Sequence, residues 1–409
     1  MRVPLYLTAV LVSGFGTTAM WLVSGIWVKS LTGSDSLAAL TAVALWAPAL
    51  AGPWCGLLAD RVRRRPLLIG VNLAMAAVLP VLLWVDRADR VWLLFVVLVV
   101  YGAQGAVHEA AEAALAAGAL DRERLGDFNG LRMTAGEAMK LVAPLVAAGL
   151  FARYGGGPVA LLDAATFAVA AGVFALLRVR EEPSARGARP RLADGGRLLW
   201  SSPGLRALVL AGGFTMLLAG LNGAAIYAVV DRGLGHAPAF AGVLYAVQGA
   251  GSVAAGLLAG PLLRRMPEWL LAATGLALFA VGAAARAVPS DPVALGASGL
   301  IGVGMPWVLV AVMTAVQRRV PAAAVGRAAG TAHTLLFAPN AVALALGAGL
   351  LAFLDVRVLL PVLGLAGLVG AGVLALTLGR TGARSAGAPA QGPVQGPAQG
   401  PAQGPVQAP

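Results

Sequence analysis

The chain has 409 residues, of which 59% are apolar and only 12% are charged, and its mean hydropathy is +0.82. Because a soluble domain carries about 25% charged residues, this composition excludes a soluble globular protein and indicates an integral membrane protein. The formal net charge of +12 would suit a nucleic-acid partner, but the positions of the basic residues along the chain argue against one.

Apolar segments of spanning length recur along the chain, each close to the about 20 residues that a helix needs to cross hydrocarbon. They predict twelve transmembrane helices: Leu5–Leu31, Leu37–Ala59, Leu67–Val85, Val91–Ala117, Leu131–Ala152, Pro158–Leu177, Leu205–Val230, Phe240–Leu263, Trp269–Val288, Val293–Val316, Ala328–Leu354 and Val358–Leu378. The first segment is too long for the core of a cleavable signal peptide, so it is interpreted as the first helix.

The basic residues indicate how these helices are oriented. When both termini are placed in the cytoplasm, most of the 30 Lys and Arg fall on the inner side. Arg132 is counted among them, with the loop before the fifth segment. Arg286 is one of the few left on the outer side. This positive-inside bias predicts a multi-pass membrane protein with both termini in the cytoplasm.

The domain organisation follows from the same pattern. We expect an N-terminal six-helix half over residues 1–178, a cytoplasmic linker over 179–204, a C-terminal six-helix half over 205–379 and a tail over 380–409. The tail repeats Gly-Pro-Ala-Gln and Gly-Pro-Val-Gln, which predicts a disordered extended segment.

The two halves repeat one another at an offset of 200 residues. The run Gly56-Leu57-Leu58-Ala59 returns as Gly256-Leu257-Leu258-Ala259, and the pair Gly126 and Gly130 returns as Gly326 and Gly330. These coincidences favour duplication of a six-helix unit. Gly260 stands where the first copy has Asp60. We therefore expect that only the first copy acts as a functional latch, a contact that holds one conformation of the protein.

The loop from Gly56 to Arg65, Gly-Leu-Leu-Ala-Asp-Arg-Val-Arg-Arg-Arg, resembles the signature loop of the major facilitator superfamily between the second and third helices. Arg63 replaces the second glycine of that signature. The resemblance implies the superfamily fold, two parallel six-helix halves with a substrate site between them, and a conformational latch formed by Gly56, Asp60, Arg61, Arg64 and Arg65. The alternative is an orientation signal whose arginines only stay in the cytoplasm.

Within the superfamily, the passage from Asp121 through Pro144 to Phe167 resembles the branch of bacterial drug, siderophore and macrolide exporters. Two exporter motifs depart from the family pattern, with Tyr101 in place of an arginine and Ala143-Pro144 as the remnant of a glycine-rich signature. The resemblance implies export of a drug-like or secondary-metabolite molecule by proton antiport, not enzymatic activity. The alternatives are a uniporter or importer of a small nutrient, or a transport-dead sensor or assembly partner.

Charged residues inside the spans are the candidate proton or substrate site, because each costs about 2.5–3.5 kcal/mol at a helix centre. The fourth span carries His108, Glu109 and Glu112, and the fifth carries Glu137 and Lys140. Because the two helices run in opposite directions, all five residues fall in one layer of the cytoplasmic half. The alternative is a structural salt bridge from Glu137 to Lys140, with Glu109 and Glu112 reaching the cytoplasmic surface or the loop arginines.

Polar and aromatic residues deep in other spans are candidates for a central cavity: Trp21, Gln104, Asn222, Gln248, Trp307 and Asn340, with Tyr227 and His333 as further members. No cofactor is expected, and His108-Glu109-Ala110-Ala111-Glu112 lacks the second histidine of a zinc-protease motif. The expected partners are a small-molecule substrate, protons and the lipid bilayer, and the protein is expected to be a monomer.

Overall fold

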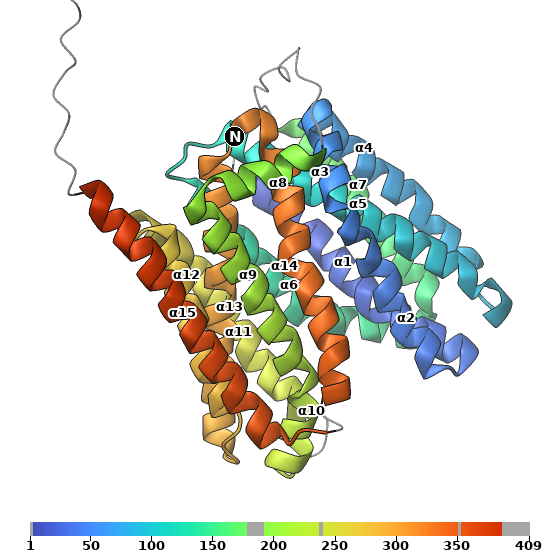
Figure 1. Ribbon diagram of the computed structural model, residues 1–409. Coiled ribbons are helices and arrows are strands. Elements are labelled where there is room, and N and C mark those ends of the chain that lie inside the picture. The colour runs from blue at the N-terminus through green and yellow to red at the C-terminus, as the bar shows by residue number, and fades with distance from the viewer. Residues whose placement is uncertain (1–2, 178–191, 237–239, 351–352, 387–409) are drawn as a thin grey trace, which may run out of the picture.

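The computed structural model describes residues 3–177, 192–236, 240–350 and 353–386. All regular elements in these ranges are helices, which confirms the predicted all-α membrane fold (Figure 1). Ten of the described helices are long and apolar enough to cross a membrane. Of the tail predicted to be disordered over 380–409, residues 380–386 continue the last helix, Val356–Ala386, and the repeats at 387–409 lie outside the described residues.

The first half of the chain forms one helical bundle. Its elements are α1 (Val3–Thr32), α2 (Asp35–Trp46), η1 (Ala47–Ala51), α3 (Gly52–Arg61), α4 (Arg64–Val78), η2 (Leu79–Trp84), η3 (Ala88–Arg90), α5 (Val91–Ala119), α6 (Leu125–Tyr154) and α7 (Gly156–Leu176). The second predicted segment is therefore a broken helix, α2, η1 and α3. Pro48 and Pro53 explain the break, since each lacks the N–H that an α-helix would bond at that position.

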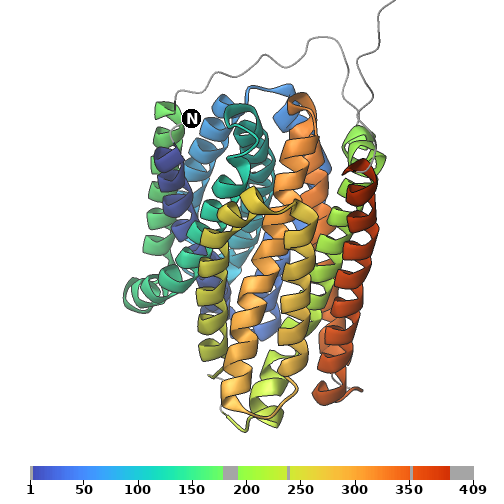
Figure 2. The same ribbon diagram turned by 90° about the vertical axis from the view of Figure 1, so that its left-hand side faces the viewer.

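The second half forms the other bundle. Its elements are α8 (Leu192–Ser201), α9 (Pro203–Ala224), α10 (Ile226–Ala228), the π-helix η4 (Val229–Gly233), α11 (Phe240–Arg265), α12 (Glu268–Ala285), α13 (Asp291–Arg319), η5 (Ala322–Ala324), α14 (Val325–Leu350) and α15 (Val356–Ala386). Helix α8 lies within the predicted linker and packs against α14. Figure 2 shows most first-half helices, coloured blue to green, on one side and most second-half helices, coloured yellow-green to red, on the other.

The outer surface of the bundles is apolar, as contact with lipid requires. Helix α15 shows this along its length, because Val358, Val362, Leu365 and Val369 follow one another at helical spacing and are between 55% and 65% exposed. An exposed apolar stripe of this length would be unstable in water and is stabilised by hydrocarbon.

We call the end of the molecule that carries the arginines at 61–65, 264–265 and 318–319 the arginine-rich end, and the other the opposite end. At the arginine-rich end, α3 of the first half packs against α14 of the second, and α11 of the second half packs against α6 of the first. Glycines allow both contacts, since a Cβ at Gly56 would overlap the backbone of Gly326 and one at Gly130 would overlap Gly256. The two contacts involve matching positions of the 200-residue repeat.

Candidate functional site

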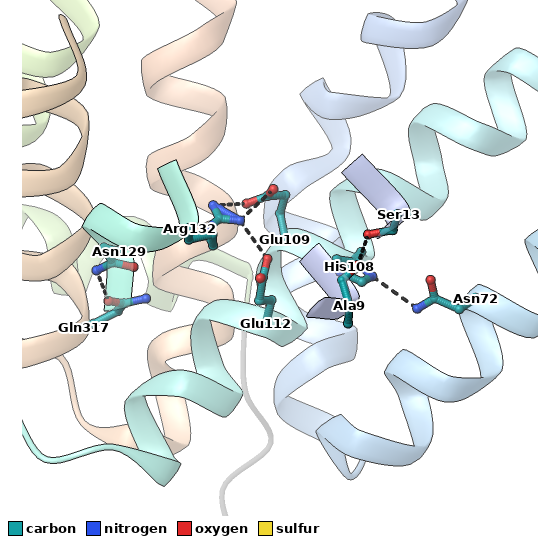
Figure 3. Close-up of polar contacts among 9 residues, drawn as sticks. All are labelled: Ala9, Ser13, Asn72, His108, Glu109, Glu112, Asn129, Arg132 and Gln317. Carbon is teal, nitrogen blue, oxygen red and sulfur yellow. Dashed lines mark hydrogen bonds and ion pairs between the residues drawn. The ribbon is translucent and has the colours of Figure 1, made fainter. Parts of the chain in front are cut away.

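Two glutamates of α5 share one arginine of α6 (Figure 3). Arg132 binds Glu109 in a bidentate manner, with Nη1 donating to Oε1 at 3.0 Å and Nη2 donating to Oε2 at 2.8 Å. Arg132 Nη1 also donates to Oε2 of Glu112 at 2.7 Å. Because two carboxylates face one guanidinium, this acidic cluster carries one net negative charge when all three groups are ionised.

The helices bring these three residues to one depth. Glu109 and Glu112 are three residues apart on α5 and therefore lie on the same face. Glu112 lies seven residues before the end of α5, and Arg132 lies seven residues after the start of α6, about 10 Å from the arginine-rich end in each case. We expected Arg132 in a loop, and its equal depth to Glu112 is the sequence signal that could have placed it in the cluster.

Glu112 is the buried member of the acidic cluster. Its side chain is 4% exposed, whereas those of Glu109 and Arg132 are 35% and 28% exposed. Glu112 Oε1 is buried and has no hydrogen-bond partner among the described residues. A buried carboxylate oxygen without a donor is unfavourable, and a proton on that oxygen would remove the charge that burial penalises.

The other predicted members of the site lie apart from this cluster. Glu137 accepts a hydrogen bond from Lys140 Nζ at 2.6 Å on the same helix, as the salt-bridge interpretation anticipated. His108 points away from Arg132, because its Nδ1 lies 3.3 Å from Asn72 Nδ2 and its ring packs against Phe174 (Figure 3). His333 of α14 interacts electrostatically with Glu109, so the second half also contributes to the surroundings of the cluster.

Asp60 joins the two halves at the arginine-rich end. Its carboxylate accepts hydrogen bonds from the backbone N–H of Gly326 at 2.9 Å and of Arg327 at 3.0 Å, and from Arg327 Nη1 at 3.2 Å. These amides open α14, where a carboxylate is favoured by the helix dipole as well as by its hydrogen bonds. Arg327, which was not predicted as a latch residue, completes this contact.

The loop arginines bind backbone carbonyls. Arg64 donates to Ala322 O at 2.6 Å in the second half and to Ala114 O at 3.2 Å in the first. Arg65 Nε donates to Phe174 O at 2.9 Å at the end of α7, where a cation is favoured by the helix dipole. The Arg61 side chain is exposed and makes no hydrogen bond or ion pair with a described residue.

The second copy of the loop also contacts the other half of the protein. Arg264 of α11 pairs with Asp127 of α6. Position 127 corresponds through the repeat to Arg327, so the acid of this pair lies on α6, whereas the acid of the first copy, Asp60, lies on the loop side. Gly260, which lacks a side chain, leaves room for Asp127.

Polar contacts continue this interface. Asn129 Nδ2 of α6 donates to Thr314 Oγ1 at 2.9 Å and to Gln317 Oε1 at 2.6 Å, both on α13 (Figure 3). Arg318 Nε donates to Arg122 O at 2.7 Å. The arginine-rich end is therefore closed by contacts from both copies of the repeat.

The predicted cavity residues differ in their surroundings. Trp21 is 49% exposed and Gln104 is half-buried, whereas Asn222 is buried with its Oδ1 unpartnered. Two of them tie helices of the second half together, since Trp307 Nε1 donates to Ala255 O at 3.1 Å and Asn340 Nδ2 donates to Met216 O at 3.0 Å. Gln248 accepts a hydrogen bond from Arg286.

A polytopic helical bundle with two repeated halves and charged groups inside the membrane is the architecture of a secondary transporter. Residues 6–337 match the family model of the Major Facilitator Superfamily, and the chain belongs to this family. No match is found among curated proteins.

Solved structures share the fold. A bacterial homologue of the iron transporter ferroportin, in its outward-facing state, has a TM-score of 0.74 at 17% identity, covering 93% of this chain and 100% of that one. The human organic anion transporter MFSD10 has a TM-score of 0.75 at 15% identity, with 91% and 98% covered. The E. coli fucose:proton symporter has a TM-score of 0.73 at 11% identity, with 91% and 98% covered. These proteins are a homologue of an iron transporter, an organic anion transporter and a sugar symporter, so this likeness defines the fold and leaves the substrate open.

Proposed function

We propose that this protein exports a drug-like or secondary-metabolite small molecule across the bacterial cytoplasmic membrane in exchange for protons, by alternating access. The arginine-rich end faces the cytoplasm in this proposal, following the positive-inside rule. The protein acts as a monomer without a cofactor, and its substrate binds between the two halves.

The observation that carries the proposal is the acidic cluster of Glu109, Glu112 and Arg132. It has one more carboxylate than guanidinium, and Glu112 has a buried oxygen without a donor. A single proton neutralises the excess charge, and so does a cationic group of a substrate. Competition between the two for one site is the simplest physical basis for antiport.

The closed arginine-rich end supports the alternating-access part of the proposal. The contact of Asp60 with α14 and the ion pair of Arg264 with Asp127 hold the halves together on that side. Substrate could reach the cluster from the cytoplasm only after these contacts break. The protein therefore has a conformation closed to the cytoplasm, with Gly56, Asp60, Arg64 and Arg65 forming the latch and Arg61 its exposed member.

The proposal is tested in inside-out vesicles with a pH-sensitive dye, while antibiotics, dyes, siderophores and sugars are added in turn. We expect at least one compound to drive proton movement with the wild type, and Glu109→Gln and Glu112→Gln to abolish it. Glu137→Gln should retain coupling because Glu137 pairs with Lys140 on its own helix. Asp89→Asn, which changes an exposed carboxylate at the opposite end, is the control.

A substrate that crosses the membrane without any proton signal would contradict antiport and favour a uniporter. Movement of substrate and protons in the same direction across the membrane would favour an importer. If none of the compounds crosses the membrane or shifts the melting temperature, the transport-dead alternative gains support.

A further inference from the structure

One arginine of the second half lies inside the protein without an acidic partner. Arg286 follows the last residue of α12 at the opposite end of the molecule, and it is only 3% exposed. Among the described residues, its side-chain hydrogen bonds go to neutral acceptors only. The sequence placed it in an outer loop, where it would have been solvated.

The Arg286 guanidinium is only partly matched by acceptors. Its Nη2 donates to Gln248 Oε1 of α11 at 3.2 Å and to Ser298 Oγ of α13 at 2.9 Å. Its Nε is buried and has no hydrogen-bond partner in the part of the chain that the structure describes. A guanidinium carries five N–H donors. Two neutral acceptors therefore leave some donors without partners and leave the positive charge without a counter-charge.

Helices α11 and α13 pack closely beside this side chain. Ser252 Oγ donates to Gly302 O at 3.0 Å, and a Cβ at Gly302 would overlap the backbone of Gln248. One and two helical turns nearer the opposite end than Ser252, the same face of α11 carries Gln248 and Tyr245. Tyr245 is 44% exposed, so this face of α11 reaches the surface of the molecule there.

A buried charge without a counter-charge costs several kcal/mol, and each missing hydrogen bond adds to that cost. An oxyanion would relieve both, because the planar fork of an arginine matches the geometry of a carboxylate or a phosphate. Gln248 offers the amide N–H donors of its side chain beside the guanidinium. Ser298 Oγ already donates its hydrogen to Ala294 O at 2.8 Å and serves Arg286 only as an acceptor. The donors that an anion would bind here are therefore those of Arg286 and Gln248.

We propose that Arg286, together with Gln248 and Tyr245, binds an oxyanion group, a carboxylate or phosphate, at the opposite end of the molecule. This group could belong to a free organic or inorganic anion or to the headgroup of an anionic lipid. The site lies in one half of the protein and is separate from the acidic cluster. It therefore does not depend on the proposed export function.

The test uses the purified full-length protein in neutral detergent at constant ionic strength. Its melting temperature is followed while sodium benzoate, inorganic phosphate or phosphatidylglycerol is added, with phosphatidylcholine as the neutral lipid. We expect at least one anionic probe to raise the wild-type melting temperature in a saturable way, and Arg286→Gln to lose the rise. Arg232→Gln, which changes an exposed arginine near the same end, should keep it.

The pattern of responses distinguishes the sources of the anion. A rise with phosphatidylglycerol alone identifies a lipid headgroup, whereas a rise with benzoate or phosphate identifies a free anion. The proposal is overturned if the folded wild type responds to none of the three, or if Arg286→Gln responds as the wild type does.

A second variant keeps the proposal testable if Arg286→Gln does not fold. Arg286→Lys retains the positive charge and loses the planar fork. We expect it to bind the effective probe at least about tenfold more weakly, about 1.4 kcal/mol. Unchanged affinity in this variant would contradict recognition by the guanidinium.

Discussion

At the scale of single residues, Arg132 holds two negative charges that would otherwise repel each other. Glu112 depends on it most, since that side chain is nearly fully buried and its second oxygen has no donor. Removing one partner of a buried ion pair leaves an uncompensated charge, which typically costs about 3–5 kcal/mol. The stability of the protein and the ionisation of its proposed proton site are therefore linked through one guanidinium.

We expect Arg132→Gln to lower the melting temperature of the purified protein, with a destabilisation of about 3 kcal/mol or somewhat less because Arg132 and Glu109 are partly solvated. The double variant Arg132→Gln with Glu112→Gln should recover much of this loss, because it removes the buried charge as well. Both the single and the double variant should lack proton-coupled transport. Equal melting temperatures for the single and double variants would show that Glu112 is not the destabilised group.

At the scale of elements, the Asp60 contact is a helix cap supplied by the other half of the protein. The carboxylate binds the first free amides of α14, so α14 has a stabilised N-terminus only while the halves are in contact. Hydrogen bonds to a charged group contribute about 1.5–3 kcal/mol. The cap thus biases the conformational equilibrium toward the form closed at the arginine-rich end.

We expect Asp60→Asn to reduce the transport rate by about tenfold or more while leaving expression and membrane insertion unchanged. An amide oxygen still accepts a hydrogen bond but lacks the charge that favours the helix N-terminus and Arg327. Initial rates per unit of membrane protein measure the effect. Wild-type rates in a normally expressed variant would remove Asp60 from the latch.

The ion pair between Asp127 and Arg264 is tested by exchanging its charges. We expect Asp127→Arg to impair transport by placing two arginines against each other, and Asp127→Arg with Arg264→Asp to restore at least part of the rate. The expected gain is modest, since the pair is half-exposed and such pairs contribute about 0.2–1 kcal/mol. Rates in the double variant no better than in Asp127→Arg would show that the pair itself is dispensable.

The positions of most helices were predictable from the sequence, whereas the contacts between the two halves were not. Hydropathy fixes where helices start and end within a few residues, because the membrane requires a length as well as an apolar composition. Asp127 and Arg264 are 137 residues apart, and only the packing of the two halves makes them partners. Arg132 was assigned to a loop because charge alone cannot distinguish a solvated arginine from one paired inside a helix.

At the scale of the whole molecule, alternating access requires the arginine-rich end to open. The contacts of Asp60, Arg264 and Asn129 lie on different helix pairs, so a rigid-body motion of one half against the other would break all of them together. A cross-link at any one of these contacts should therefore stop transport completely rather than slow it.

The pair Asn129 and Gln317 offers the clearest place for such a cross-link, since their side chains are in contact at 2.6 Å across α6 and α13. Cys55 is the only cysteine in the chain, so Cys55→Ala gives a background free of thiols. We expect Asn129→Cys with Gln317→Cys in this background to react with a short bifunctional thiosulfonate and to lose transport. Cleavage of the linker by a reductant should restore it, and each single cysteine variant should be unaffected by the reagent. Transport that continues in fully cross-linked protein would mean that this interface stays closed throughout the cycle, and the substrate would then need a path that does not pass between the halves.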